Sequence, residues 1–331
     1  MAAPPPRRLF RAVAAPRRRS GRKRRPGAPR GGGEQGGADG PPRPAPPRRR
    51  AASSSSGLAP PSRADRAGCT SDTLSLSDRY YVAMDFSGHG LSSHRPAGSP
   101  YHFLDYVSDV RRVAAALQWR RFTLMGHSMG GCVAGMFCFL YPEMVDKLIL
   151  LENLGFLLGP EDTEAWLKSK RMVIDRLLSL EAKQQTPKAR SPEAALQRLL
   201  EANRHLTAEG GAILLQRGAT ETPAGLVYNR DMRVHMQSRE SFTVEQCVKL
   251  LQKIQDRVLI IIAQDGLLVP HNLDSTNHVV KALWEAFEST LKQHIQLVEV
   301  PGSHFVHLNE PEVVSGIIGN FLTAQNTRAR L

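Results

Sequence analysis

Residues 126–130 read Gly-His-Ser-Met-Gly, and they join an apolar run, Arg121–Gly126, to a stretch of small and apolar residues, Met129–Leu140. The first run predicts a buried strand and the second a helix, so the pattern Gly-x-Ser-x-Gly falls on a strand-to-helix turn. We expect this turn to be so tight that side chains at the two glycines would clash, and to strain the backbone of Ser128. A glycine-rich turn with an idle serine is the alternative, and the strand-helix context favours the first interpretation.

The position of Ser128 suits a nucleophile, because its hydroxyl would project above the end of the sheet. The backbone N–H of Met129 lies at the N-terminus of the predicted helix, where the helix dipole favours negative charge, so we expect it to stabilise an oxyanion. His127 would point away from the serine hydroxyl. We therefore expect His127 to line the substrate-binding pocket or to pack, and not to act as the base.

A serine hydroxyl needs a general base, and the C-terminal part of the chain offers one. His304 ends the sequence Val-Pro-Gly-Ser-His at 300–304, directly after the predicted strand Ile295–Val300. A histidine on this loop can reach the end of the strand that carries Ser128. His307 is the competing candidate, but the chain order of serine, acid and histidine favours His304.

The alternation of strands and helices predicts an α/β fold with a mostly parallel sheet and right-handed crossovers. The predicted strands are Tyr80–Phe86, Arg121–Gly126, Lys147–Leu151, Arg257–Ala263 and Ile295–Val300, and the predicted core helices span Phe103–Leu117, Met129–Leu140 and Pro311–Leu322. Asp85 reads as structural, since it can hold the Gly88–Ser92 turn by hydrogen bonds. The core is thus assigned to residues 80–152 and 255–325.

Residues 153–254 differ from the core because their helical patterns carry charged faces. The predicted helices are Thr163–Leu180, Ser191–Asn203 and Thr243–Ile254. They follow one core strand and precede another, so they predict a helical cap inserted into the α/β domain.

The net charge of +13 is confined to one end of the chain. Fifteen of the 44 basic residues but only two of the 31 acidic residues lie within residues 1–50, so residues 51–331 carry 29 of each. Residues 1–79 are rich in Arg, Pro, Gly and Ser, which predicts disorder. A mitochondrial transit peptide and a basic RNA-binding arm are the alternatives. We expect no nucleic-acid partner, because no aromatic residues interleave the arginines for base stacking.

The remaining composition points to an intracellular protein without a transmembrane segment. No apolar run is long enough to cross a bilayer, and arginines interrupt every short apolar run near the start. The four cysteines match no zinc pattern, and we expect Cys132 and Cys138 to be buried thiols. No metal and no organic cofactor are implied.

Several of these segments together resemble the α/β-hydrolase superfamily with a helical cap. They are Asp-Phe-Ser-Gly-His-Gly-Leu-Ser at 85–92, Gly-His-Ser-Met-Gly-Gly at 126–131, the run 142–151, and Val-Pro-Gly-Ser-His at 300–304. Residues 78–323 are similar to the vertebrate serine hydrolase-like proteins, with Leu214–Gly218 and Asn229–Asp231 adding to the similarity. The resemblance implies a serine hydrolase of the esterase or thioesterase type that works through an acyl-enzyme on Ser128.

The resemblance also bears on the acid that orients His304. Asp265 follows the strand Arg257–Ala263, which is the commonest location of this acid in the fold, and Glu152 follows Lys147–Leu151, a known alternative. We expect Asp265, with Glu152 as the alternative. Family members also begin with about three strands and a His-Gly oxyanion loop, for which residues 1–79 show no counterpart. We therefore expect the N-terminal strands to be missing, and a catalytically impaired binding protein or a truncated isoform is the alternative function.

The chain ends in Ala329-Arg330-Leu331, a small residue, a basic residue and leucine. This matches the Ser-Lys-Leu class of peroxisomal address, so we expect an import receptor as a partner. The resemblance adds a link to peroxisomes and perinuclear vesicles. The expected location is the peroxisome or the cytoplasm, with the mitochondrion as the alternative.

Overall fold

Four parallel strands form the central sheet of the computed structural model, which describes residues 80–157, 162–183, 188–236, 241–254, 257–268 and 294–324. All of these residues belong to one unit of the chain, which includes residues 67–331. Residues 1–79, with Cys69, and residues 329–331 lie outside the described residues. The expectations stated for those segments therefore stay predictions.

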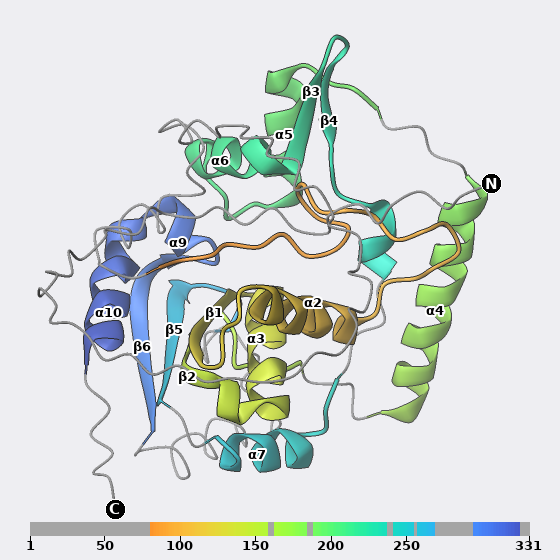
Figure 1. Cartoon of the computed structure of the whole chain (residues 1–331). Helices are drawn as coiled ribbons and strands as arrows, with labels where there is room; N and C mark the ends of the chain where they lie inside the picture. Colours follow the sequence, from red (N-terminus) through yellow and green to blue (C-terminus); the bar gives the residue numbers. More distant parts are fainter. Residues whose placement is uncertain are drawn as a thin grey trace, which may run out of the picture. The chain divides into compact units, whose positions relative to one another are not determined.

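The strand order in this sheet is β1-β2-β5-β6, and all three pairings are parallel (Figure 1). The bounds are Phe122–His127 for β1, Val145–Leu151 for β2, Arg257–Asp265 for β5 and Ile295–Ser303 for β6. The register places His127 beside Leu151 and Leu151 beside Ile261. The carboxyl ends of the four strands thus share one edge of the sheet, as the sequence pattern predicted.

Helices cover both faces of the sheet. Those of the predicted core are α2 (Phe103–Ala116), α3 (Met129–Leu140), the 3-10 turn η2 (Pro142–Met144), α9 (Val306–Asn309) and α10 (Pro311–Thr323). The bounds of α2, α3 and α10 agree with the predicted helices to within one residue. Figure 1 shows α2 and α3 on one side of the sheet and α10 on the other.

The core falls into two clusters, because successive side chains of a strand point to opposite faces. On β2, Leu148 and Leu150 join the cluster that includes α2 and α3, whereas Ile149 and Leu151 join the cluster with α10. A strand that is buried on both faces needs an apolar residue at every position. This explains the unbroken apolar run at the end of β2. Cys132 and Cys138 of α3 are buried, as expected.

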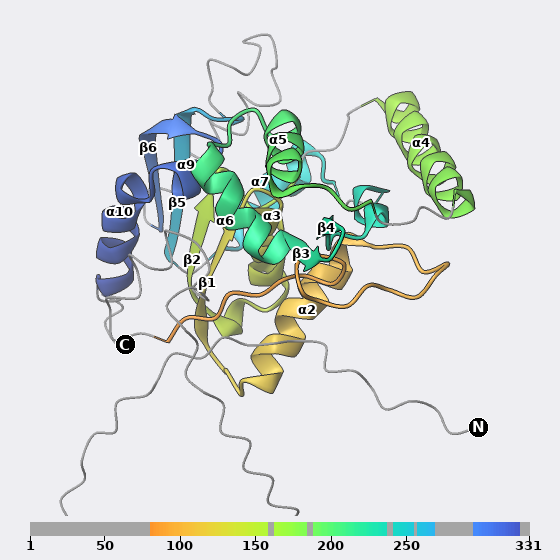
Figure 2. The same ribbon diagram turned by 90° about the horizontal axis from the view of Figure 1, so that it is seen from above.

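The insertion between β2 and β5 contains more than the three helices predicted for it. Its elements are α4 (Thr163–Ala182), α5 (Pro192–Ala202), α6 (Ala208–Gly218), the hairpin of β3 (Ala219–Thr222) and β4 (Gly225–Tyr228), the 3-10 helix η3 (Met232–Met236) and α7 (Val244–Gln252). The helix α6 and the hairpin were not predicted. Figure 2 shows α5 and α6 near α9, the short helix that comes directly after β6. Cys247 and Leu251 of α7 belong to the same core cluster as α2 and α3.

The segment Tyr80–Phe86 is not a strand, so that prediction is wrong. Its apolar side chains are nevertheless packed: Tyr81 contacts the cluster around α10, and Met84 and Phe86 contact the cluster around α2 and α3. A strand requires ladder hydrogen bonds to a neighbour, and within the described sheet β1 pairs only with β2. The apolar pattern therefore reflects the packing of these side chains against the core and not a described strand.

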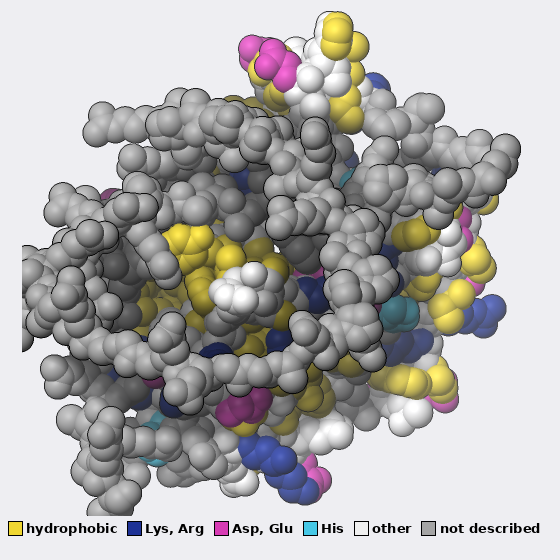
Figure 3. Space-filling model, viewed as in Figure 1, with side chains coloured by type: hydrophobic (Ala, Val, Ile, Leu, Met, Phe, Trp, Pro, Cys, Tyr) yellow, Lys and Arg dark blue, Asp and Glu magenta, His cyan; other side chains and the backbone are white. Residues whose placement is uncertain are grey.

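The helix α4 has no buried residue along its length. Trp166, Leu167, Ile174 and Leu178 are all exposed, and Figure 3 shows hydrophobic and basic side chains mixed on the surface over α4. In the described ranges, every helix is too short or too polar to span a membrane.

Candidate functional site

Ser128 lies on a strained turn between β1 and α3. Its backbone dihedrals are φ 49° and ψ −119°, a region that residues with side chains rarely adopt. Its N–H donates to the carbonyl of Leu151 at 3.0 Å, and its carbonyl accepts from the N–H of Gly131 at 2.8 Å. The turn is therefore tied both to the end of β2 and to the first turn of α3.

The two glycines of the Gly-x-Ser-x-Gly motif have different roles. A Cβ atom on Gly126 would lie 2.2 Å from the carbonyl oxygen of Gly130, so only glycine fits there. A Cβ atom on Gly130 would meet nothing within 4 Å. The expected clash is confirmed at Gly126 and wrong at Gly130, because the helix turns the Cα–H of Gly130 toward open space.

His304 and Glu152 form a buried pair at the carboxyl edge of the sheet. The Nδ1 atom of His304 lies 3.0 Å from Oε2 of Glu152, and both side chains are nearly inaccessible to solvent. Since a carboxylate can only accept, Nδ1 of His304 carries a proton, and in the neutral ring Nε2 then holds the lone pair. This is the tautomer that a general base needs.

The carboxylate of Glu152 is held by three donors. Besides His304, the N–H of Ala263 donates to Oε1 at 2.7 Å and the N–H of Leu267 donates to Oε2 at 3.0 Å. Burial alone would raise the pKa of Glu152, but the hydrogen bonds from His304, Ala263 and Leu267 outweigh burial and lower this pKa below its ordinary value. Glu152 is therefore ionised at neutral pH.

The preference for Asp265 over Glu152 as the partner of His304 is corrected by this geometry. Asp265 is still part of β5, where it pairs with Ser303, and its side chain is exposed. Glu152 directly follows β2 and has a φ of 51°, and its side chain accepts a hydrogen bond from the N–H of Ala263 in the neighbouring strand β5. In the described contacts, the carboxylate that binds Nδ1 of His304 is therefore that of Glu152 and not that of Asp265.

Gly266 makes room for Glu152, and the sequence reasoning missed this. A Cβ atom on Gly266 would lie 2.3 Å from Oε2 of Glu152. The glycine that follows Asp265 in the sequence was the available signal, because a glycine at a strand end marks a close approach of another group.

His127 and His307 pack around His304. The Nε2 atom of His127 lies 2.7 Å from the carbonyl oxygen of His304, so this nitrogen donates. The ring centroid of His127 lies 4.7 Å from that of His304 and 4.0 Å from that of His307. Burial and the neighbouring His307 and His304 lower the pKa of His127 to about 3, and burial with His304 lowers the pKa of His307 to about 4. Both flanking rings are neutral at physiological pH.

Hydrogen bonds join the insertion to the loop that carries His304. Asn309 in α9 accepts from the N–H and the hydroxyl of Thr207, both at 3.1 Å, and its amide donates to the carbonyl of His205 at 2.8 Å. The hydroxyl of Ser303 donates to the same carbonyl at 3.0 Å. The residues on both sides of His304 are thus fixed to the start of α6. Nothing in the sequence alone linked Asn309 to Thr207, which lies 102 residues earlier.

A second contact joins the insertion to the turn after Phe86. The carboxylate of Asp85 accepts from the N–H of Leu91 at 3.0 Å and forms an ion pair with Arg217 of α6. This confirms the expected role of Asp85 in holding the turn. On the same side, Tyr101 donates to Asp231 at 2.9 Å, and Arg233 binds Asp231 and three carbonyls of the 95–99 segment.

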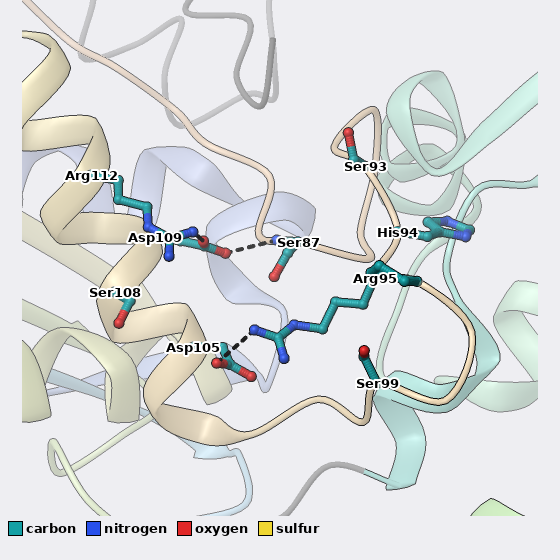
Figure 4. A pocket seen from close by; sticks show the side chains of 10 residues that line it. Ser87, Ser93, His94, Arg95, Ser99, Asp105, Ser108, Asp109 and Arg112 are labelled. Carbon is teal, nitrogen blue, oxygen red and sulfur yellow. Dashed lines mark hydrogen bonds and ion pairs between the residues drawn. The ribbon is translucent and has the colours of Figure 1, made fainter. Parts of the chain in front are cut away.

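A polar cavity of about 340 Å³ lies between α2 and the 87–99 turn (Figure 4). Its charged residues pair with one another or with the backbone: Arg95 with Asp105 at 2.8 Å, and Asp109 with the N–H of Ser87 at 3.0 Å. Ser128, Glu152 and His304 do not line this cavity.

Comparisons with known proteins identify the family and the fold of this chain. The alpha/beta hydrolase fold family matches residues 68–311. Serine hydrolase-like protein 2 of Homo sapiens is 47% identical over 247 residues, which cover 74% of this chain and 79% of that protein. The serine hydrolase-like protein of Mus musculus is 45% identical over 260 residues, covering 77% and 84%. The crystal structure of the hypothetical protein PA1622 from Pseudomonas aeruginosa PAO1 is similar with a TM-score of 0.66 and 26% identity, covering 78% of this chain and 88% of that one.

Proposed function

The chain belongs to the α/β-hydrolase fold family and to its serine hydrolase-like proteins, and from this premise we propose that it is a serine hydrolase acting on a carboxylic ester or thioester. In this proposal Ser128 is the nucleophile, His304 the general base and Glu152 the orienting acid. The observation that carries the proposal is the hydrogen bond of 3.0 Å between His304 and Glu152, which leaves Nε2 of His304 as the basic nitrogen.

The proposed reaction proceeds through an acyl-enzyme. The Oγ atom of Ser128 attacks the carbonyl carbon of the substrate while Nε2 of His304 takes the hydroxyl proton. The N–H of Met129, the first residue of α3, stabilises the resulting oxyanion together with the positive end of the helix dipole. The intermediate collapses, and the alcohol or thiol leaves with the proton held by His304. Water then attacks the acyl-Ser128 ester by the same route, which releases the acid and restores the serine.

The insertion is proposed to act as the cap over this site. The hydrogen bonds of His205 and Thr207 to Ser303 and Asn309 support this role, because they hold the start of α6 beside the loop that carries His304. A cap so placed would set the size of the acyl group that reaches Ser128.

The test is fluorophosphonate labelling of the purified chain beside its Ser128→Ala variant. The parent should label and the variant should not. His304→Ala should also lose labelling by about a hundredfold or more, because general-base catalysis of this kind contributes that much. His307→Phe should label within about threefold of the parent. Labelling that persists in Ser128→Ala would refute the nucleophile assignment.

A non-catalytic binding protein built on the same fold is the second candidate. One sequence observation favours it: residues 1–79 contain no histidine, so the His-Gly oxyanion loop of the family has no counterpart there. A parent chain with intact circular dichroism that fails to label would favour this candidate over the hydrolase.

We also propose that Ala329-Arg330-Leu331 directs the protein to peroxisomes, since this ending matches the Ser-Lys-Leu class of address. Cytoplasmic or mitochondrial location is the alternative outcome. Deleting the three residues should move a tagged protein from peroxisomes to the cytosol, and an unchanged distribution would refute the proposal.

A further inference from the structure

His127 links the segment that carries Ser128 to the segment that carries His304. It is the last residue of β1 and immediately precedes Ser128, yet its ring contacts the segment that carries His304, far away in the sequence. Its Nε2–H donates to the backbone carbonyl of His304 at 2.7 Å, and this hydrogen bond directly joins the segment of Ser128 to the segment of His304.

The surroundings of His127 determine its protonation. Its ring lies between the rings of His304 and His307, with Phe305 at 5.6 Å between centroids, and burial among them keeps its pKa low. A second cation at this distance would oppose proton uptake by His304 during catalysis. A neutral ring donates one hydrogen bond without adding such a charge.

We propose that His127 is a positioning residue, whose hydrogen bond to the carbonyl of His304 holds the base in register with Ser128. This inference rests on the proposed function of Ser128 and His304. It gives the Nε2–H donor of His127 a partner within the protein, the carbonyl of His304.

Two variants separate this hydrogen bond from simple packing. His127→Phe keeps an aromatic ring between His304 and His307 but removes the donor, whereas His127→Gln loses the ring but keeps an amide N–H at similar reach. A small displacement of a catalytic group costs up to about a hundredfold in rate. We therefore expect the second-order rate constant of fluorophosphonate labelling to fall about 10- to 100-fold in His127→Phe and only about threefold in His127→Gln.

His307→Phe is the matched control, because it replaces the other ring that flanks His127 and should leave labelling within about threefold of the parent. The opposite order, with His127→Phe active and His127→Gln impaired, would show that packing alone matters and would overturn the proposal. Equal labelling in all variants would overturn it as well.

A second readout does not depend on activity. Amide hydrogen exchange in residues 302–309 should accelerate in His127→Phe and stay near the parent rate in His127→Gln. Unchanged exchange in His127→Phe would overturn the positioning role. A folded parent that never labels would refute the proposed function instead, and the exchange rates would still report whether His127 holds the loop.

Discussion

Replacing Glu152 by glutamine tests the orienting acid, and Asp265→Asn is its matched control. Both changes remove one carboxylate charge with little change in size, and both positions end a neighbouring strand of the same sheet. Of these two carboxylates, Glu152 is the one that contacts His304 in the described structure, with 3.0 Å between Oε2 and Nδ1. The two variants should therefore differ in activity although they differ little in composition.

The expected magnitude follows from the distance. Two unit charges about 3.0 Å apart interact by about 5 kcal/mol at an effective dielectric constant of about 20. His304 becomes an imidazolium in the transition state, so this attraction is lost in Glu152→Gln, and about 5 kcal/mol corresponds to nearly 10⁴ in rate. We expect a fall of about 10³- to 10⁴-fold in Glu152→Gln and of less than about threefold in Asp265→Asn.

The assay is the second-order rate constant of fluorophosphonate labelling, measured well below the unfolding temperature of each variant. Glu152→Gln should also be less stable by about 1–3 kcal/mol, because the glutamine amide must face the N–H of Ala263 or of Leu267. Circular dichroism at the assay temperature separates that loss from an effect on chemistry. Equal rates in the folded Glu152→Gln variant and the parent, or a large loss in Asp265→Asn, would refute the assignment.

Three further predictions concern stability. Between about pH 7 and about pH 5, the free energy of unfolding should fall by about 2 kcal/mol for each of His127 and His307. The reason is that the pKa of each ring is lowered in the folded state, so only the unfolded chain takes up protons in this range. The contribution of each ring to stability is fully present above the ordinary histidine pKa and is lost as the pH falls toward the folded-state pKa. Urea unfolding at both pH values should show that His307→Phe removes about half of the combined fall from the two histidines, and a fall equal to that of the parent would contradict the prediction. Asn309→Ala should lose about 0.5–1.5 kcal/mol in urea unfolding, since it removes the acceptor of two Thr207 donors and one of the two donors to the carbonyl of His205; no loss would show that water replaces it. Gly126→Ala should prevent folding, as seen by circular dichroism, whereas Gly130→Ala should fold, and equal behaviour would contradict the steric difference between them.

The proposed catalytic residues show how far local pattern reaches. The Gly-x-Ser-x-Gly motif and the hydrophobic periodicity located β1, α3 and the loop of His304, because a strand, a helix and a tight turn each have a local signature. The same periodicity misassigned Tyr80–Phe86, since an extended segment that packs its apolar side chains looks like a strand until its partner is sought.

Long-range contacts were beyond the sequence by itself. The choice between Glu152 and Asp265 depended on where each strand ends and on the close approach of Gly266, which are properties of neighbouring strands in register. The contacts of His127 with His304 and of Thr207 with Asn309 join residues 177 and 102 positions apart. Local sequence therefore determined which groups stand at the carboxyl edge of the sheet, and only the tertiary structure decided which of them meet, because hydrogen bonds require distances that chain order does not specify.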